Sequence, residues 1–349
     1  MRWHPLRFAP IYRERVWGGR SMESQFHRAL PDGRPIGESW EISDRSDALS
    51  IVSEGPLSGR TLADLLNSDP AGLLGDAVPR AGRFPLLVKI LDARDTLSLQ
   101  VHPPAACAAA LGGETKTELW YFTASHPGAE IFAGLRPGTT RDDFEASIAS
   151  GTVDRCFHRV GVGPGDAMFL PSGRVHALGA GLMLFEIQEN SDTTYRVFDW
   201  NRVGLDGSPR ALHVAESLAS IDFTDFAPGL VDSDWKQEST IETRLLTAGP
   251  PFRAEARRAP ATASPTFKIP LPRCVILGVV HGSIRVLDDA APLQLGAGDF
   301  CLLPAALREV TVDVTSGTEW IQAEPNPGAR INPIPGCPPT AIDTAQVPS

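Results

Sequence analysis

The chain is built from short apolar segments separated by turn-forming residues. Its 349 residues include 32 glycines and 31 prolines, which are spread along the whole sequence rather than gathered in one linker. This pattern is typical of many short strands joined by turns, and it favours an all-β sandwich or barrel over alternating strands and helices. The clearest predicted strands are residues 86–91, 97–101, 118–123, 167–170, 184–188, 194–200, 275–280, 284–287, 300–303 and 310–314.

Signals for helices are few. Thr61 is followed three positions later by Asp64, and Thr140 by Asp143, which is the pattern of a capping box at the start of a helix. We therefore expect two short helices that begin after these threonines. The alanine-rich segment 104–111 predicts one or two further helical turns.

A weak internal repeat divides the chain. Residues 165–171 (GDAMFLP) return as residues 298–304 (GDFCLLP), and each copy places a Gly-Asp turn before an apolar strand that ends at proline. A chain of this length is expected to form two or three domains, at roughly 100–200 residues each. We expect two barrels of related build, at residues 1–235 and 236–325. Residues 326–349 are rich in proline and polar residues, which predicts an extended tail.

Charge and cysteine content restrict the partners and the compartment. The chain carries 32 Lys and Arg against 42 Asp and Glu, a formal net charge of −10 at pH 7. Such an acidic protein is a poor partner for nucleic acids and for anionic membranes. No apolar run reaches the ~20 residues of a membrane helix, and the N-terminus has no apolar core of signal-peptide length. The five cysteines are scattered and never form a CxxC pair, so we expect no disulfide framework and a cytoplasmic location.

Four candidate metal ligands lie on or beside predicted strands. Because side chains alternate along a strand, Gln100 and His102 share one face of a strand, and Glu118 lies on the next strand along the chain. His176 follows the first copy of the repeat, beyond a proline and a glycine that bend the chain. Two imidazoles, one carboxylate and one amide oxygen suit Zn²⁺ or another divalent ion with an open position. A single histidine on a strand is more often a packing or surface residue, so the prediction depends on the four residues together.

The combination of motifs resembles a known family. Gln-x-His on one strand, Lys-x-Glu on the next, and the pattern Gly-x5-Pro-x-Gly-x2-His form the two-part signature of a metal-binding cupin barrel. The chain is also similar to the short, bacterial-type class I mannose-6-phosphate isomerases (phosphomannose isomerases), which are zinc enzymes with two cupin domains. Residues 240–325 resemble the C-terminal cupin of that family more loosely. The matching stretches are residues 16–19, 36–43, 84–91, 97–103, 116–121, 165–176, 189–192 and 195–200.

The resemblance implies a fold, an activity and a set of site residues. It implies two cupin (jelly-roll) barrels, one Zn²⁺ per chain, and interconversion of mannose 6-phosphate and fructose 6-phosphate through a cis-enediol. Arg196 matches the essential active-site arginine of the family, and Glu186 matches a carboxylate proposed to transfer the proton. Lys116 and Ser98 match pocket positions near the sugar phosphate. The zinc ligands of the family correspond to Gln100, His102, Glu118 and His176.

The residues themselves leave alternatives for some of these roles. Arg196 shares a predicted strand face with Phe198 and Trp200, so it is either a packing residue stacked on the rings or a planar donor for a phosphate or an enediolate. Lys116 taken alone is an ordinary surface lysine, and its place two residues before Glu118 on the same face is what suggests a role in the site. Four further residues match family motifs, but we expect them to serve packing and ion pairing: Trp17, Glu38, Trp40 and Glu41.

The chain also departs from the family pattern. The second copy of the repeat leads to Glu309 where the pattern calls for histidine, so the second barrel is expected to bind no metal. Between His102 and His176 the chain lacks the long helical insertion that borders the active site of longer family members. Two other functions remain open, a non-catalytic sugar- or sugar-phosphate-binding cupin and a metal cupin enzyme of another reaction, such as a dioxygenase or an enzyme acting on another sugar. We expect a monomer or a homodimer.

Overall fold

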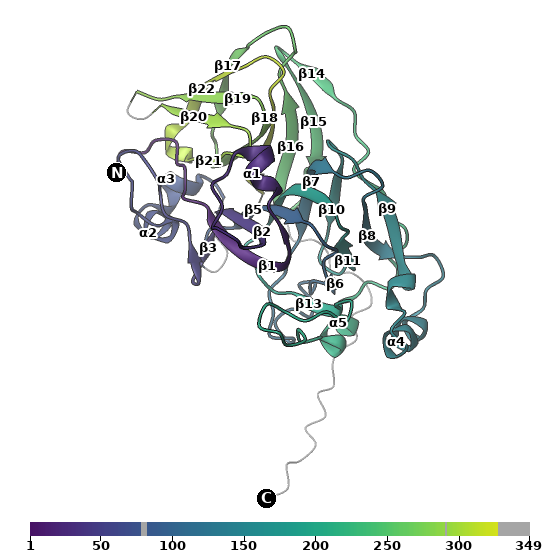
Figure 1. Cartoon of the computed structure of the whole chain (residues 1–349). Coiled ribbons are helices and arrows are strands. Elements are labelled where there is room, and N and C mark those ends of the chain that lie inside the picture. Colours follow the sequence, from purple (N-terminus) through teal and green to yellow (C-terminus); the bar gives the residue numbers. More distant parts are fainter. Residues whose placement is uncertain (78–81, 290–291, 327–349) are drawn as a thin grey trace, which may run out of the picture.

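The computed structural model describes residues 1–77, 82–289 and 292–326. Most of its strands form four antiparallel sheets, two from the first half of the chain and two from the second half (Figure 1). The helices are short. This arrangement confirms the expected all-β, cupin-like fold with a few short helices.

The first half of the chain forms the first and second sheets. The first sheet has six strands, in the order β1 (Ile11–Gly19), β2 (Ile36–Ile42), β5 (Leu86–Ala93), β12 (Leu182–Glu189), β7 (Glu118–Ser125) and β10 (Ala167–Leu170). The second sheet has five strands, in the order β13 (Tyr195–Phe198), β6 (Leu99–Val101), β11 (His176–Leu178), β8 (Glu130–Leu135) and β9 (Phe157–Gly161). A small ribbon joins β3 (Asp44–Arg45) to β4 (Ala48–Leu49).

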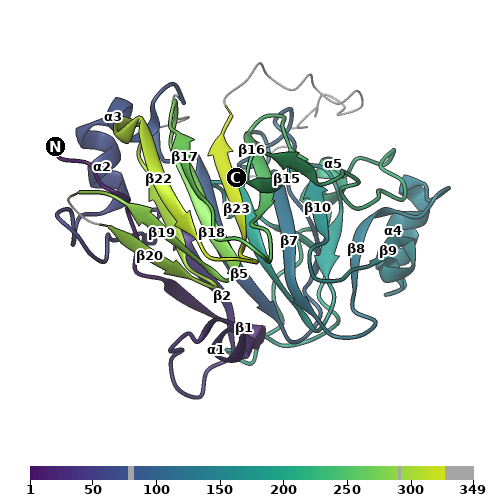
Figure 2. The ribbon, with the colours of Figure 1, turned by 90° about the horizontal axis from the view of Figure 1, so that it is seen from above.

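The second half forms the third and fourth sheets, and Figure 2 shows the fourth sheet on the side of the molecule opposite β8 and β9. The third sheet has the order β14 (Lys236–Glu238), β15 (Ile241–Thr247), β16 (Phe252–Arg258), β23 (Glu319–Pro325), β18 (Val275–His281) and β21 (Phe300–Leu303). The fourth sheet has the order β17 (Thr266–Pro270), β22 (Glu309–Val314), β19 (Ser283–Leu287) and β20 (Leu293–Gly296).

Two of the helices begin at the capping boxes that the sequence predicts. Thr61 precedes α2 and Thr140 precedes α4, and in both cases the threonine side chain and the third residue of the helix bond reciprocally. Segment 104–111 forms turns rather than a helix. The helices are α1 (Ser21–Phe26), α2 (Leu62–Ser68), α3 (Pro70–Leu74), α4 (Arg141–Ala149) and α5 (Val214–Ser220), with 3₁₀ turns η2 (Val153–Cys156) and η3 (Ala305–Leu307).

Strands β5 and β12 of the first sheet are buried on both faces, which explains why they are mostly apolar. In β5, Val88 and Ile90 pack against residues of the third sheet, whereas Leu91 belongs to the core between the first and second sheets. Side chains alternate along a strand, so Lys89 points to the same side as Leu91. Lys89 therefore faces the space between the first two sheets, where the site lies.

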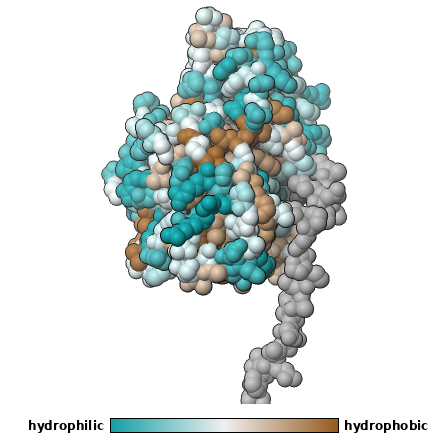
Figure 3. All heavy atoms as spheres, turned by 90° about the vertical axis from the view of Figure 1, so that its right-hand side faces the viewer, coloured by the Kyte–Doolittle hydropathy of each residue, from teal (hydrophilic) through white to brown (hydrophobic). Residues whose placement is uncertain are grey.

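Contacts between the halves of the chain fix the third sheet against the first. Leu6 forms a bridge with Leu302, and Arg28 donates hydrogen bonds to both Glu41 and the carbonyl of Gly298. The face of the molecule shown in Figure 3 is largely hydrophilic, with apolar areas between the polar ones. Among the described residues, no helix is both long and apolar enough to cross a membrane. The tail expected beyond Pro325 lies, from residue 327 onward, outside the described residues.

Candidate active site

Three of the predicted ligands come together from the two facing sheets of the first half. Gln100 lies in β6 and pairs with His176, the first residue of β11, while His102 follows the end of β6. Glu118 begins β7 on the first sheet, opposite them. One ligand atom from each of His102, Glu118 and His176 lies within 4.8 Å of the others, and all three residues are buried.

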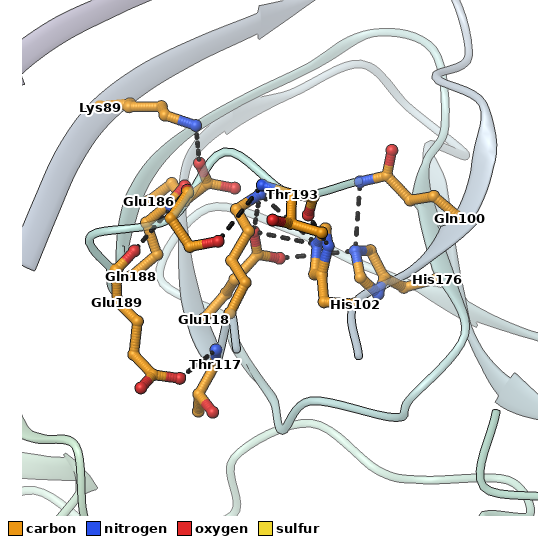
Figure 4. Close-up of polar contacts among 12 residues, drawn as sticks. Lys89, Gln100, His102, Thr117, Glu118, His176, Glu186, Gln188, Glu189 and Thr193 are labelled. Atoms are coloured by element: carbon orange, nitrogen blue, oxygen red, sulfur yellow. Dashed lines mark hydrogen bonds and ion pairs between the residues drawn. The ribbon is translucent and has the colours of Figure 1, made fainter. Parts of the chain in front are cut away.

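The two imidazoles point the same ring nitrogen at the carboxylate (Figure 4). Nε2 of His102 is 3.4 Å from Oε1 of Glu118, and Nε2 of His176 is 3.4 Å from Oε2. The opposite ring nitrogens are held by backbone carbonyls, at 2.7 Å from Thr193 for His102 and at 2.9 Å from Arg174 for His176. Since Nδ1 donates to a carbonyl, Nε2 of a neutral imidazole carries the lone pair.

This arrangement fits a bound cation. Burial, followed by the nearby Lys116 ammonium, lowers the pKa of His102 to about 3, and burial also lowers the pKa of His176, so both rings are neutral. Their Nε2 lone pairs then face the oxygens of Glu118, and Oε2, which lies opposite His176, accepts no hydrogen bond among the described residues. Acceptors that face acceptors in a buried site repel one another unless a cation lies between them. Two imidazoles and a carboxylate are a common donor set for a divalent metal ion.

Gln100 lies beside the cluster. Its amide nitrogen is 3.3 Å from Nε2 of His176, and Ser98 donates a hydrogen bond to its amide oxygen at 3.4 Å. The two ends of an amide exchange places when the group rotates by half a turn. That rotation brings the Gln100 oxygen to the side that faces the histidines.

Lys116 contacts the cluster of His102, Glu118 and His176. Its Nζ is 2.5 Å from Oε1 of Glu118 and 3.4 Å from Nε2 of His102. Burial by itself lowers the pKa of the Lys116 ammonium, but the carboxylates of Glu118 and Glu186 outweigh burial and raise the pKa above its usual value. The same ammonium lowers the pKa of Glu118 well below its usual range, although burial opposes this.

Glu186 is held by two donors on the inner face of the first sheet. The indole of Trp120 donates to its Oε1 at 3.0 Å, and Lys89 forms an ion pair with its Oε2 at 3.0 Å. Burial raises the pKa of the Glu186 carboxyl above its usual value despite the ion pair. Lys89 is not among the predicted site residues. Its signal was a lysine inside an otherwise apolar strand, directly across from Glu186 in the sheet.

Arg196 lies in β13 next to Gln100. Its side chain is half-buried, and among the described residues it forms neither a hydrogen bond nor an ion pair, while its Nε is shielded from solvent. Phe198 and Trp200 pack edge-to-face against each other, with ring centroids 5.4 Å apart. In the described part of the chain no aromatic ring lies under the Arg196 guanidinium, so the structure gives no support to a stacked packing role.

A cavity of about 520 Å³ opens beside the cluster. This volume lies in the range of small-molecule sites. Glu38, which we expected only to serve ion pairing, lines it and accepts a two-pronged contact from Arg15 at 2.9 and 3.0 Å. Burial raises the pKa of Glu38, but Arg15 and Lys89 outweigh it and lower the pKa to about 2. The charged residues that line the cavity are Glu14, Arg15, Glu38, Lys89, Lys116, Glu186, Asp192, Arg196, Asp206 and Arg210.

Comparisons with known proteins agree on one family. The family model described as "Phosphomannose isomerase type I, catalytic domain" matches residues 6–134. The mannose-6-phosphate isomerase of Streptococcus mutans is 33% identical over 310 residues, which are 88% of this chain and 95% of that protein. A mannose-6-phosphate isomerase of Bacillus subtilis is 34% identical over 311 residues, 88% of this chain and 96% of the relative.

Solved structures show the same relationship. The crystal structure of the mannose 6-phosphate isomerase from Bacillus subtilis has a TM-score of 0.82 and 29% identity, and the match covers 92% of this chain and 99% of that one. The apo form of the Salmonella typhimurium enzyme, at 18% identity and a TM-score of 0.70, shares the fold over 92% of this chain and 99% of its own.

Proposed function

The chain belongs to the class I mannose-6-phosphate isomerase family, and from this premise we propose that it interconverts mannose 6-phosphate and fructose 6-phosphate through a cis-enediol. The observation that carries the proposal is the buried cluster of His102, Glu118 and His176 beside a cavity that Glu186 and Arg196 line. Aldose–ketose isomerisation needs a base, cationic groups for the developing oxyanion and a hold on the phosphate. The cavity offers residues for each requirement.

We propose Zn²⁺ as the bound ion, one per chain. The facing Nε2 and carboxylate atoms support a divalent cation at this place, and the amide of Gln100 is in position to complete the set. Zinc bound there supplies Lewis-acid polarisation of the substrate carbonyl and hydroxyl oxygens. The proposed ligands are Gln100, His102, Glu118 and His176.

Glu186 is the proposed base. It accepts the proton from C2 of the open-chain aldose and returns it to C1, while Trp120 and Lys89 hold its two oxygens in place. A carboxyl with a raised pKa is a stronger base than an ordinary glutamate, and Glu186 has such a pKa because it is buried. Lys89 compensates the charge of the carboxylate before the proton arrives.

Two cationic side chains are proposed to bind the oxygens on C1 and C2 of the substrate. Lys116 donates hydrogen bonds to the C1 and C2 oxygens at the metal end of the cavity, since its Nζ lies beside Glu118. Arg196, one strand further along, has unused donors and stabilises the negative charge of the enediolate. Ser98 lines the same end of the cavity and contacts the substrate there.

The proposal also covers the domains, the oligomeric state, the location and the partners of the chain. We propose a catalytic domain at residues 1–235 and a metal-free domain at 236–325, in a monomer or homodimer of the cytoplasm without nucleic-acid or membrane partners. The net charge of −10 supports the absence of polyanionic partners. The described cysteines (107, 156, 274 and 301) are buried and form no disulfide, which suits a reducing compartment.

A coupled assay of purified, metal-loaded protein with mannose 6-phosphate tests the function. We expect turnover to fructose 6-phosphate, its loss on chelation and its recovery on addition of Zn²⁺. Folded protein that holds metal and binds mannose 6-phosphate without converting it would instead support a sugar-phosphate-binding cupin.

A further inference from the structure

A short hairpin after β13 forms one wall of the cavity. Val203 bridges to Pro209, and the amide of Gly204 donates to the carbonyl of Ser208 at 2.7 Å. Residues Gly204, Leu205, Asp206 and Arg210 of this segment line the cavity. Leu205 is 54% exposed although it lines the cavity, so the hairpin lies at the mouth. None of the predicted site residues lies in this segment.

One buried carboxylate anchors the hairpin through two arginines. Asp199 accepts hydrogen bonds from Arg202 at 3.0 and 2.7 Å and from Arg210 at 2.7 and 2.5 Å. A single negative charge leaves one of these two guanidinium charges uncompensated. Arg210 lines the cavity, whereas Arg202 donates instead to the carbonyl of Thr96 and does not line it.

The cavity wall near the hairpin is therefore a place for an anion. Arg196 has no anionic partner among the described residues, and burial, followed by the charge of Arg210, lowers its pKa. Asp192 and Asp206 also line the cavity, but neither pairs with Arg210. A dianion beside Arg210 relieves the repulsion between the two guanidinium groups.

The order of the strands in the second sheet indicates how the substrate is oriented in the cavity. His176, Gln100 and Arg196 are cross-strand neighbours on β11, β6 and β13, and the amide of His213 donates to the carbonyl of Arg196 at 2.8 Å, beyond β13. Adjacent strands are about 4.8 Å apart, so the segment that carries Arg210 lies roughly three spacings from the strand of His176.

The isomerisation requires that C1 and C2 of the substrate lie at the end of the cavity next to the proposed metal ligands. The proton moves between C1 and C2, and the phosphate on C6 is at the other end of the carbon chain. Lys116 contacts Glu118 and His102 directly, so a phosphate bound to Lys116 would bring C6, not C1 and C2, to the cluster of His102, Glu118 and His176. The phosphate must lie away from these residues, toward the hairpin.

We propose that Arg210 binds the phosphate group of the substrate and is the residue that selects a phosphate monoester over an unphosphorylated sugar. This inference rests on the proposed isomerase function for the identity of the substrate. Asp199 positions the guanidinium by binding its Nε and Nη2, which leaves Nη1 as the donor for the phosphate, and Arg196 adds positive potential between the phosphate and the enediolate. The exposed hairpin that ends at Arg210 covers this end of the sugar phosphate.

Arg210→Met and Arg202→Met are a matched pair, because each removes one of the two arginines on Asp199 and only the first residue faces the cavity. We expect Arg210→Met to raise KM for mannose 6-phosphate about 10- to 100-fold, more than it lowers kcat, whereas Arg202→Met stays near wild type. Calorimetric titration with inorganic phosphate should show the same loss of affinity in Arg210→Met only. Arg210→Lys, which keeps the charge but not the fork, should fall between.

The two readouts separate this inference from the proposed function. Phosphate affinity that is unchanged in Arg210→Met, or lost equally in Arg202→Met, would overturn the role of Arg210. If Arg210→Met does not fold, Arg210→Lys with wild-type KM and wild-type phosphate affinity would do the same. Wild-type protein that binds phosphate through Arg210 but has no isomerase turnover would refute the proposed function and leave the phosphate site standing.

Discussion

The two copies of the repeat form the same turn but lead to different interiors. In the first copy the amide of Gly163 donates to Asp166 at 2.8 Å, and in the second the amide of Gly296 donates to Asp299 at 2.8 Å. Gly165 and Gly298, which follow, both have positive φ angles, of 86° and 80°. An equal distance beyond these glycines, the first chain segment reaches buried His176.

The second segment reaches Glu309, whose exposed side chain pairs with Lys268 at 2.7 Å. The core between the third and fourth sheets is made of apolar residues such as Val275, Leu277 and Trp320. The corresponding space in the first half holds buried charges on the side of the first sheet and buried imidazoles on the side of the second. The turn therefore belongs to the scaffold, and the residues that face inward decide whether a barrel can hold a metal. In the described ranges, the only group of histidine, cysteine and carboxylate side chains close enough to hold one is in the first half.

Removal of a proposed ligand in the first half should abolish metal binding and activity, whereas the matching change in the second half should affect neither. We expect His176→Ala to lose the metal and essentially all isomerase activity, because Gln100, His102 and Glu118 then lack a fourth donor. Glu309→Ala, at the matching position of the second repeat, should keep both. Metal analysis and the coupled assay on both variants check this. A metal-replete, active His176→Ala protein would remove His176 from the ligand set.

Arg196 should matter for the rate and little for stability. Loss of a preorganised charged donor typically costs about 3–4 kcal/mol, so Arg196→Ala should lower kcat by roughly 10²–10³, more than it raises KM, and Arg196→Lys should recover little. Steady-state kinetics and thermal unfolding on the same samples measure this, with exposed Arg285→Ala of the second half as control. Near-normal kcat with a lowered Tm would make Arg196 a packing residue.

The ion pair between Glu38 and Arg15 in the cavity wall should add to the free energy of unfolding, and this contribution should depend on pH. The folded-state pKa of Glu38, about 2, lies below the unfolded value near 4.5, so the contribution is complete above pH 4.5 and is lost as the pH falls through about 2. Glu38→Gln should cost on the order of 3 kcal/mol at pH 7, with a difference from wild type that shrinks below pH 4.5.

Glu309→Gln is the control for this pH series, because the exposed Glu309–Lys268 pair should contribute less than about 1 kcal/mol. Urea unfolding from pH 7 to pH 3 measures both variants. A Glu38→Gln deficit that stays constant over this range would show that the carboxylate charge is not its source.

The smallest expected effect is on metal content, when the histidine that the second repeat lacks is introduced. Glu309→His restores the residue that the motif calls for, yet the metal content should stay at one ion per chain, because among the described residues no group of histidine, cysteine and carboxylate side chains in the second half is close enough to hold a metal. Two ions per chain would show that a histidine at this position is enough, and the contrast between the halves would fail.

The features that the sequence predicts well are local ones. The capping boxes at Thr61 and Thr140 depend on residues three positions apart, and the alternation around Gln100 and His102 depends on the strand itself. The predicted strand at residues 194–200 is shorter in the structure, because Trp200 and Asn201 have positive φ angles and end it. Helix α5 was not predicted, since no side chain caps its N-terminus.

The features that the sequence leaves open depend on contacts between distant strands. Lys89 and Glu186 are almost a hundred residues apart and become neighbours only because β5 pairs with β12. Arg210 enters the cavity wall through a hairpin held by Asp199, and no periodic pattern marks such a segment. The ion pair of Glu38 also depends on such a contact between strands, because its partner Arg15 lies on the neighbouring strand.

A zinc-edge anomalous diffraction map of the purified, metal-loaded protein tests the difference between the two halves most directly. The account predicts one strong peak per chain, between Nε2 of His102, Nε2 of His176 and the carboxylate of Glu118, and none beside Glu309. A map of metal-replete crystals with no peak at the cluster, or with a peak in the second half, would contradict it.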